Sequence, residues 1–191
     1  MGRALRALRR GRIGLMGHVY EGMLDMNSDP TMVQGFFGAH VEHLELDDLA
    51  ECVRAVTAAQ AAERLALIRN LFLFPEPGAD PIAGPVDPAE LDWAARVSVG
   101  LEALVEERAL SGLAYYYRGL GGNENERLAS SLTIGSSLLT GRGVPIAGEY
   151  DLVSFRQACL ESFEWGVVKS VPRRWRRRLS DATHSMEHPA G

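Results

Sequence analysis

The sequence has 191 residues, of which 46% are hydrophobic and 24% charged, and its formal net charge is −5. This length suffices for one domain with a buried core, and the composition is typical of an ordinary soluble globular protein. No apolar run reaches the length of a membrane span, and the basic N-terminus is followed by no signal-peptide pattern. Two cysteines are too few for a disulfide framework, so we expect a reduced, cytoplasmic setting and no membrane partner.

The basic residues gather at the two ends of the chain. Eleven of the twenty lie within residues 1–12 and 169–178, whereas residues 13–168 hold nine basic residues against twenty-three acidic ones. An acidic body with basic ends indicates a coherent domain flanked by sequence of different character rather than a nucleic-acid-binding face. We therefore expect the arginine-rich stretch near the C-terminus to be a solvated tail. Phosphate contact by that tail is the alternative, and it would be salt-sensitive.

The first forty-six residues predict two strands and a short helix. Residues 12–17 read as a short buried strand that ends in glycine, followed by a loop rich in Gly, Asp, Asn and Met. Residues 31–37 are expected to form a helix, because Ser28-Asp29-Pro30 is a typical helix start. Alternating polar and apolar residues over 40–46 favour a strand.

A long helix is predicted next. Asp47 and Asp48 are its expected caps. The residues that recur on its predicted apolar face are Leu49, Cys52, Val53, Val56, Ala59 and Ala62. Residues 72–88 hold five prolines and two glycines, which indicates a loop or hinge.

The remaining pattern alternates helix and strand. A helix is predicted over 88–110, a strand over 111–117, a second helix over 124–140 after a glycine-rich turn, and a strand over 144–148. This alternation predicts an α/β fold, a mostly parallel Rossmann-like sheet with helices on both faces. In such sheets ligands bind beyond the carboxyl ends of the strands. The loops expected there are 17–29, 118–126 and 148–152.

Carboxylates are the chemically promising residues of these loops. Glu124 and Glu126 follow one predicted strand, and Glu149 and Asp151 follow the next. Carboxylates at the ends of neighbouring parallel strands can converge on Mg²⁺ or Mn²⁺, which prefer oxygen ligands. The same two glutamates would also stabilise a helix N-terminus through its dipole. Residue chemistry alone leaves both interpretations open.

Two long blocks of the sequence resemble the L-arabinose and L-fucose isomerases. The longer block is LDWAARVSVGLEALVEERALSGLAYYYRGLGGNENERLASSLTIGSSLLTGRGVPIAGEYDL, and the earlier one is GRIGLMGHVYEGMLDMNSDPTMVQGFFGAHVEHLELDDL. Together the likeness covers about residues 10–152. Family members are larger, with a sugar-binding domain before this region and a catalytic domain that continues after it.

The resemblance implies conversion of aldoses to ketoses by movement of hydrogen between C1 and C2. A divalent metal, usually Mn²⁺, would hold the sugar oxygens and stabilise an enediolate-like transition state. Glu124 and Glu149 match the two metal-binding glutamates, which can also transfer protons. Glu126 competes for the first position, because the alignment tolerates a small shift there. Met23 matches a substrate-facing methionine.

After Leu152 the resemblance stops, and the family's metal-binding histidine segment has no counterpart among the residues that follow. His18, His40 and His43 could substitute in principle, but histidines so placed are more often hydrogen-bonded surface residues. We therefore expect the chain alone to have little or no isomerase activity. The rival hypothesis is a non-catalytic scaffold that binds sugar or partner isomerase subunits, since the family forms oligomers.

These observations divide the chain into three parts. They are a basic N-terminal extension (1–9), an isomerase-like α/β domain (10–152) and a divergent C-terminal helix with a basic tail (153–191).

Overall fold

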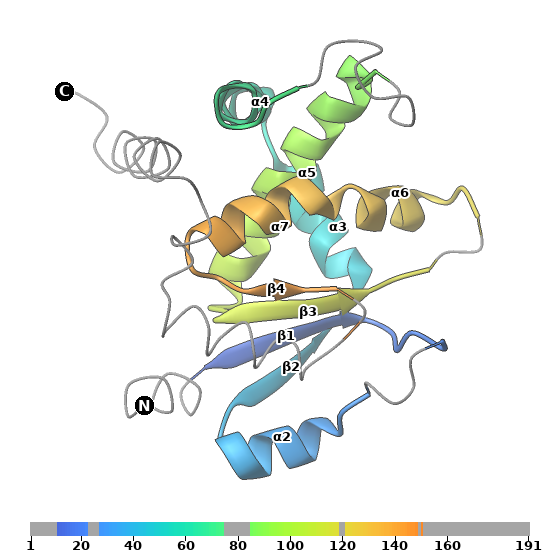
Figure 1. Ribbon diagram of the computed structural model, residues 1–191, viewed down its shortest axis with the longest axis vertical. Helices are drawn as coiled ribbons and strands as arrows, with labels where there is room; N and C mark the ends of the chain where they lie inside the picture. The colour runs from blue at the N-terminus through green and yellow to red at the C-terminus, as the bar shows by residue number, and fades with distance from the viewer. Residues whose placement is uncertain (1–10, 23–26, 75–84, 119–120, 149, 151–191) are drawn as a thin grey trace, which may run out of the picture.

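Four parallel strands form the centre of the computed structural model, which describes residues 11–22, 27–74, 85–118, 121–148 and 150. The strands are β1 (Arg12–Gly17), β2 (His40–Leu44), β3 (Gly112–Tyr116) and β4 (Ile146–Ala147). Their order across the sheet is β2-β1-β3-β4, and every neighbouring pair is parallel. Figure 1 shows their carboxyl ends meeting at one edge of the sheet.

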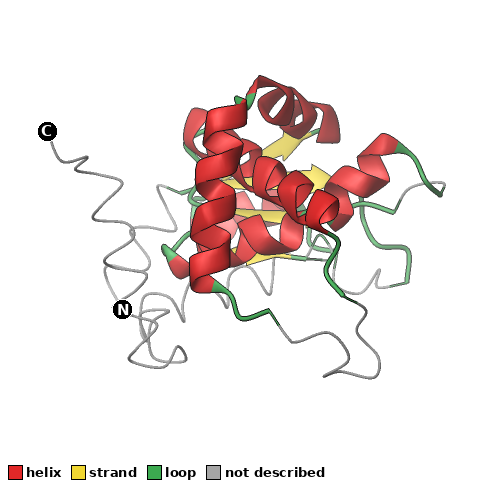
Figure 2. Ribbon diagram, turned by 90° about the horizontal axis from the view of Figure 1, so that it is seen from above, coloured by secondary structure: helices red, strands yellow, loops and turns green. Residues whose placement is uncertain are grey.

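Helices lie on both sides of this sheet, as the alternating pattern predicts. The helices are α2 (Pro30–Phe37), α3 (Leu46–Ala55), α4 (Ala58–Leu71), α5 (Pro88–Glu107), α6 (Glu124–Ser130) and α7 (Leu132–Gly141). Of the described helices, α2 lies on one side of the sheet in Figure 1, and the others form a layer that covers the strands in the view of Figure 2. The predicted α/β class is thus confirmed. None of the described helices is both long enough and apolar enough to cross a membrane.

The core has a separate apolar cluster on each side of β1. Ile13 and Leu15 pack toward α2 with Ala114 of β3. Met16 faces the larger helical layer, where it joins Leu113 and the buried side chains of α3 and α5. β1 is therefore apolar on both faces, which explains why it reads as a continuous apolar run rather than an alternating one.

α2 has the start that its sequence predicts. The Asp29 carboxylate accepts hydrogen bonds from the Thr31 backbone N–H at 2.8 Å and from the Thr31 hydroxyl at 2.7 Å, and Pro30 is the first helical residue. Those hydrogen bonds lower the pKa of Asp29. The helix ends at Gly38, whose φ of 75° is left-handed and whose N–H donates to Gln34 O at 2.8 Å. Asp-Pro and Gly therefore mark the two ends of α2.

The prediction of a single long helix after residue 46 is wrong, because the chain turns between α3 and α4. Val56 leaves the helical conformation with ψ 125° and buries its side chain, and Arg96 of α5 donates to its carbonyl oxygen. α3 begins at Leu46, and Glu45 is its N-cap residue. Asp48 is the third residue of the helix, and its carboxylate accepts a hydrogen bond from the Glu45 N–H.

The change of direction also changes which residues of α4 are buried. Ala59 and Ala62, predicted on the apolar face, are exposed. The buried positions are Ala61, Arg64, Ile68 and Leu71. The break starts a new helix with its own period, so a face extrapolated from α3 cannot be correct.

Thr57 starts α4 through a reciprocal pair of hydrogen bonds. Its hydroxyl accepts from the Gln60 N–H at 3.3 Å, and the Gln60 side chain accepts from the Thr57 N–H at 2.9 Å. Thr57→Ala is expected to lower the free energy of unfolding by about 1 kcal/mol, since one helix-end N–H loses its acceptor. Urea denaturation measures this loss. Thr133→Ala, at an exposed position within α7, is the control and should be nearly neutral.

The predicted helix 124–140 is likewise divided, into α6 and α7, at Ser131. The Ser131 hydroxyl donates to Arg127 O at 2.7 Å, and Ser130 donates to the same oxygen at 3.0 Å. Hydroxyls that bond back to the preceding turn compete with the regular helical pattern and bend helices. The last strand is also shorter than predicted, with two residues in the sheet.

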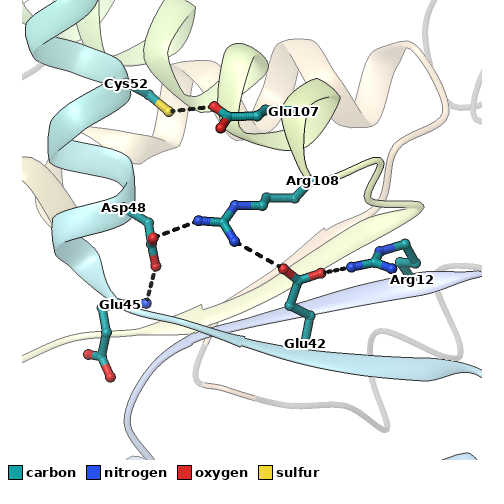
Figure 3. A network of polar contacts seen from close by, with 7 residues as sticks. All are labelled: Arg12, Glu42, Glu45, Asp48, Cys52, Glu107 and Arg108. Atoms are coloured by element: carbon teal, nitrogen blue, oxygen red, sulfur yellow. Dashed lines mark hydrogen bonds and ion pairs between the residues drawn. The ribbon is translucent and has the colours of Figure 1, made fainter.

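Arg108, at the end of α5, ties that helix to β2 and α3 (Figure 3). Its guanidinium contacts Glu42 at 3.3 Å and Asp48 at 2.8 Å, and Glu42 also pairs with Arg12 of β1. Such partly exposed ion pairs each add little stability. Their joint effect is to set where the end of α5 meets the β2 edge of the sheet.

Cys52 of α3 lies beside these ion pairs, with its sulfur 3.9 Å from the Glu107 carboxylate. Burial, followed by the negative charge of Glu107, raises the pKa of the Cys52 thiol. A thiol that stays protonated is a poor nucleophile and a poor metal ligand. We therefore assign Cys52 a packing role.

Candidate functional site

The order of the strands marks one place as the expected ligand site. From β1 the chain passes to β2 on one side, and it then returns to place β3 on the other side of β1. The loops that leave β1 and β3 therefore diverge, and a crevice opens between them at the carboxyl edge. Figure 1 shows both loops extending from that edge, with α6 beside them.

A pocket of about 590 Å³ lies at this point. Its lining comes from the loop after β1, the end of β3 and the first turn of α6: His18, Val19, Glu21, Tyr116, Arg118, Gly121 and Glu126. The volume is in the usual range for small-molecule sites. Polar groups and one aromatic ring dominate its wall, which suits a polar ligand with some apolar surface.

Gly17 allows the start of the loop after β1 to lie against the end of β3, and both of these segments line the pocket. Its φ is +94°, and a Cβ atom there would lie 1.9 Å from the carbonyl oxygen of Tyr116. Glycine alone fits this close approach of two strands at a left-handed conformation. The next residue, His18, then donates its N–H to the same Tyr116 oxygen at 3.1 Å.

The His18 ring is oriented by contacts to two backbone groups. Its Nδ1 lies 3.0 Å from the Val19 carbonyl oxygen, and its Nε2 lies 3.4 Å from the backbone N–H of Arg118, 100 residues away in the sequence. A carbonyl can only accept, so the proton belongs on Nδ1 and the Nε2 lone pair receives the Arg118 N–H. The ring also meets Tyr116 edge-on, with centroids 5.3 Å apart.

Glu21 and Arg118 form the exposed rim of the pocket. Their charged groups are 3.5 Å apart, and the two side chains are 83% and 67% exposed. An ion pair in that position adds little to stability. Both side chains are therefore free to exchange this contact for hydrogen bonds to a ligand. Beside them, the rings of Tyr20 and Tyr116 lie 4.8 Å apart.

Of the two competing glutamates of α6, it is Glu126 that lines the pocket. Its backbone N–H donates to Asn123 Oδ1 at 2.8 Å, and its carboxylate accepts from the Gly122 N–H. Asn123 therefore caps the N-terminus of α6, and the Glu126 carboxylate is bonded to the residue that precedes this cap. Glu124 is the first residue of α6 and is exposed.

The third predicted loop approaches the same edge of the sheet. The Tyr150 N–H donates to Tyr115 O at 3.1 Å, so this part of the chain runs beside β3. The Tyr150 ring packs on the α2 side, where burial, and then Glu45, raises the pKa of its hydroxyl. Glu149 and Met23, the other two residues that the resemblance implies, lie outside the described residues.

The described residues supply an incomplete set of ligands for a metal. Within them, no three His, Cys, Asp or Glu side chains are grouped closely enough to hold an ion. Glu124 and Glu126 offer the oxygen donors that Mn²⁺ accepts, but the Glu126 carboxylate already accepts the Gly122 N–H. These two carboxylates do not by themselves complete a coordination shell.

No known family model matches this chain, and no curated protein is significantly similar to it. The resemblance to the sugar isomerases therefore stays a prediction from the two sequence blocks.

The sequence patterns located the pocket better than they identified its residues. Two of the three predicted loops, 17–29 and 118–126, meet in it. The sequence patterns do not distinguish Tyr116, Glu21 and Arg118 from other loop residues, and they favour a surface role for His18. The signal for His18 lay in its position, because it directly follows a glycine that ends a buried strand.

Proposed function

We propose that residues 10–152 form the α/β domain of an aldose–ketose isomerase-family protein, and that the pocket between β1 and β3 binds a monosaccharide. The observation that carries the proposal is the meeting of the two resembling blocks. His18 and Glu21 come from the first block, whereas Arg118 and Glu126 come from the second, and all four line one pocket. In open α/β sheets, ligands usually bind in the crevice between loops that diverge after neighbouring strands, and these two loops are of that kind.

The chemistry of the lining suits a sugar. A monosaccharide presents many hydroxyl groups together with small apolar C–H faces. Glu21 and Arg118 can accept and donate hydrogen bonds to adjacent hydroxyls, and charged partners make such bonds stronger. The ring of Tyr116 offers an apolar face for the C–H groups.

A role in metal binding is proposed only for the two glutamates that the resemblance implies. By the resemblance, Glu124 and Glu149 would be two of the ligands of Mn²⁺. We further propose that this chain by itself has little or no isomerase turnover, because the family's histidine segment is not among its 191 residues.

Sugar binding is tested by titrating the purified chain with L-arabinose and with L-fucose and following protein amide shifts by NMR. We expect saturable shifts at the loops after β1 and β3. Arg118→Ala should weaken binding about tenfold or more, since one charge-assisted hydrogen bond is lost. Arg54→Ala, an exposed arginine outside the pocket, is the matched control. Equal affinity of the two variants, or no saturable shift, would contradict the proposal.

The same preparation separates the catalytic and scaffold hypotheses. Ketose formation is measured with added Mn²⁺, and we expect none above background. Robust turnover that Glu149→Gln abolishes would overturn the expected inactivity. Sugar binding that Mn²⁺ does not change would favour the non-catalytic sugar-binding scaffold over a degraded enzyme.

A further inference from the structure

The described helices cover the two faces of the sheet unequally. On one face α2 is the one described helix, and it packs against β1 and β2, whereas the other helices form the layer on the opposite face (Figure 1). Helices normally cover both faces of a parallel sheet. On the α2 side, β3 and β4 contribute Ala114 and Ala147 to the apolar cluster, and no described helix lies over these two strands.

α2 presents two large apolar side chains beside its buried stripe. Phe36 is 78% exposed and Met32 is 49% exposed. They are four residues apart, so they lie on the same side of the buried Val33. α2 runs from the carboxyl edge of the sheet back to its amino edge in a right-handed crossover, and the right-handed turn of the helix therefore directs both side chains toward β3 rather than toward the outer edge at β2. Apolar side chains grouped in this way indicate a surface that another apolar segment contacts.

The chain also leaves the described residues on this face. Tyr150, the last of them, donates its N–H to Tyr115 O at 3.1 Å, and its ring packs against the α2-side cluster. Residues 151–191 therefore begin beside β3, next to the strands that no described helix covers on this side.

The segment that follows has the sequence pattern of an amphipathic helix. The apolar residues that recur every three or four positions are Leu152, Phe155, Cys159, Phe163 and Val167. Glu161 and Glu164 fall on the opposite side of such a helix. We propose that residues 152–167 form a helix that docks beside α2, with its apolar side on β3, β4, Met32 and Phe36. This inference goes beyond the proposed function and does not depend on sugar binding.

The length of the segment and its point of attachment suit this docking surface. A helix over 152–167 is about 24 Å long, and β1, with six residues, is about 20 Å long. Only Asp151 separates the segment from Tyr150, so the helix must begin at the carboxyl edge and run toward the amino edge, as α2 does. Cys159 then lies about level with Phe36, because each is roughly two turns from the start of its helix.

The chain's own segment is favoured over a second copy of the protein as the occupant. A segment tethered through one residue is present at an effective concentration in the millimolar range or above, which a separate molecule in dilute solution does not reach. The apolar side chains of the segment also need a partner surface, since their exposure to water is unfavourable.

Cys159 provides a direct probe of this contact, because it belongs to the proposed apolar side and the chain has one other cysteine. In the full chain with Cys52→Ser, the Phe36→Cys variant is treated with a bis-maleimide whose arm spans about 10 Å, the spacing of neighbouring helices. We expect a link between position 36 and Cys159 within one molecule, read by intact mass and by the cross-linked tryptic peptide.

The matched control is Ala59→Cys in the same Cys52→Ser background. Ala59 is also an exposed helical residue, but it belongs to α4 in the opposite layer. Its yield of linked product should be lower by about tenfold or more, since the sheet separates this position from the proposed helix.

A second pair of variants tests whether the apolar side of the segment makes the contact. Phe163→Asp, added to the Phe36→Cys variant, should lower the yield about tenfold, because docking would bury an unpaired charge. Glu161→Gln, on the opposite side of the predicted helix, should leave the yield unchanged. Circular dichroism checks that both proteins remain folded.

Three results would overturn the inference. They are equal yields for Phe36→Cys and Ala59→Cys, no link at either position, and a yield that Phe163→Asp does not lower. A link between two chains in place of the internal one would also overturn it, because a second copy would then occupy the surface. Sugar binding is measured separately by the NMR titration, so either proposal can fail without the other.

Discussion

Gly100→Ala is expected to destabilise the protein by about 3 kcal/mol, at the upper end of the cost of overpacking a core. Gly100 lies in α5 where this helix crosses α3. An added Cβ would lie 2.4 Å from Val53 Cγ2 and 2.9 Å from the Val53 backbone N and Cα. A side chain can rotate away, but the backbone of α3 cannot move without opening the main core cluster. The loss is read as a fall in the free energy of unfolding in urea.

Gly35→Ala is the matched control for this change. Gly35 is also a helical glycine, in α2, but no atom of the described residues outside its own helix turn lies within 4 Å of the position that its Cβ would take. Alanine there should raise stability by about 0.5–1 kcal/mol, because glycine loses more backbone freedom on folding. If the two alanine variants had similar stability, the close crossing of α3 and α5 would be wrong.

Arg64→Ala is the second change with a large expected effect, about 3 kcal/mol. Arg64 is 7% exposed, donates to Ser98 Oγ at 2.8 Å and pairs with Glu102. Removing one partner of a buried ion pair typically costs 3–5 kcal/mol, and we expect the lower end because Glu102 keeps its contact with Arg142. Arg69→Ala, an exposed arginine of the same helix, should change stability by less than about 0.5 kcal/mol.

Arg64→Met distinguishes the contribution of charge from that of packing. Burial lowers the pKa of Arg64, so the folded protein holds this charge at a cost, and its Nε atom has no hydrogen-bond partner among the described residues. Methionine fills a similar volume without that cost, so its variant should be more stable than Arg64→Ala by about 1–2 kcal/mol. Urea denaturation of both variants measures the difference. Equal losses would show that the ion pair, and not the filled volume, stabilises the contact between α4 and α5.

Much of the secondary structure could be predicted because its causes are local. The apolar run of β1 and the Asp29-Pro30 start of α2 act within a few residues, so the sequence shows them directly. The break between α3 and α4 is not predicted, although Thr57 and Gln60 signal a new helix. The apolar pattern continues through Ala59 and Ala62 and so favours one unbroken helix, but in the structure those two side chains are exposed.

Some features of the candidate site likewise follow from local sequence patterns, and others follow only from the tertiary structure. By itself the sequence determined a parallel α/β sheet and the loops that must lie at its carboxyl edge, because strand period and direction follow from local patterns. Only the tertiary structure decided that β3 pairs with β1, that the loops after these two strands share a pocket, and that Glu126 rather than Glu124 reaches it. Strand order depends on contacts between residues about 100 positions apart, such as His18 and Arg118, and no local pattern encodes such a pairing.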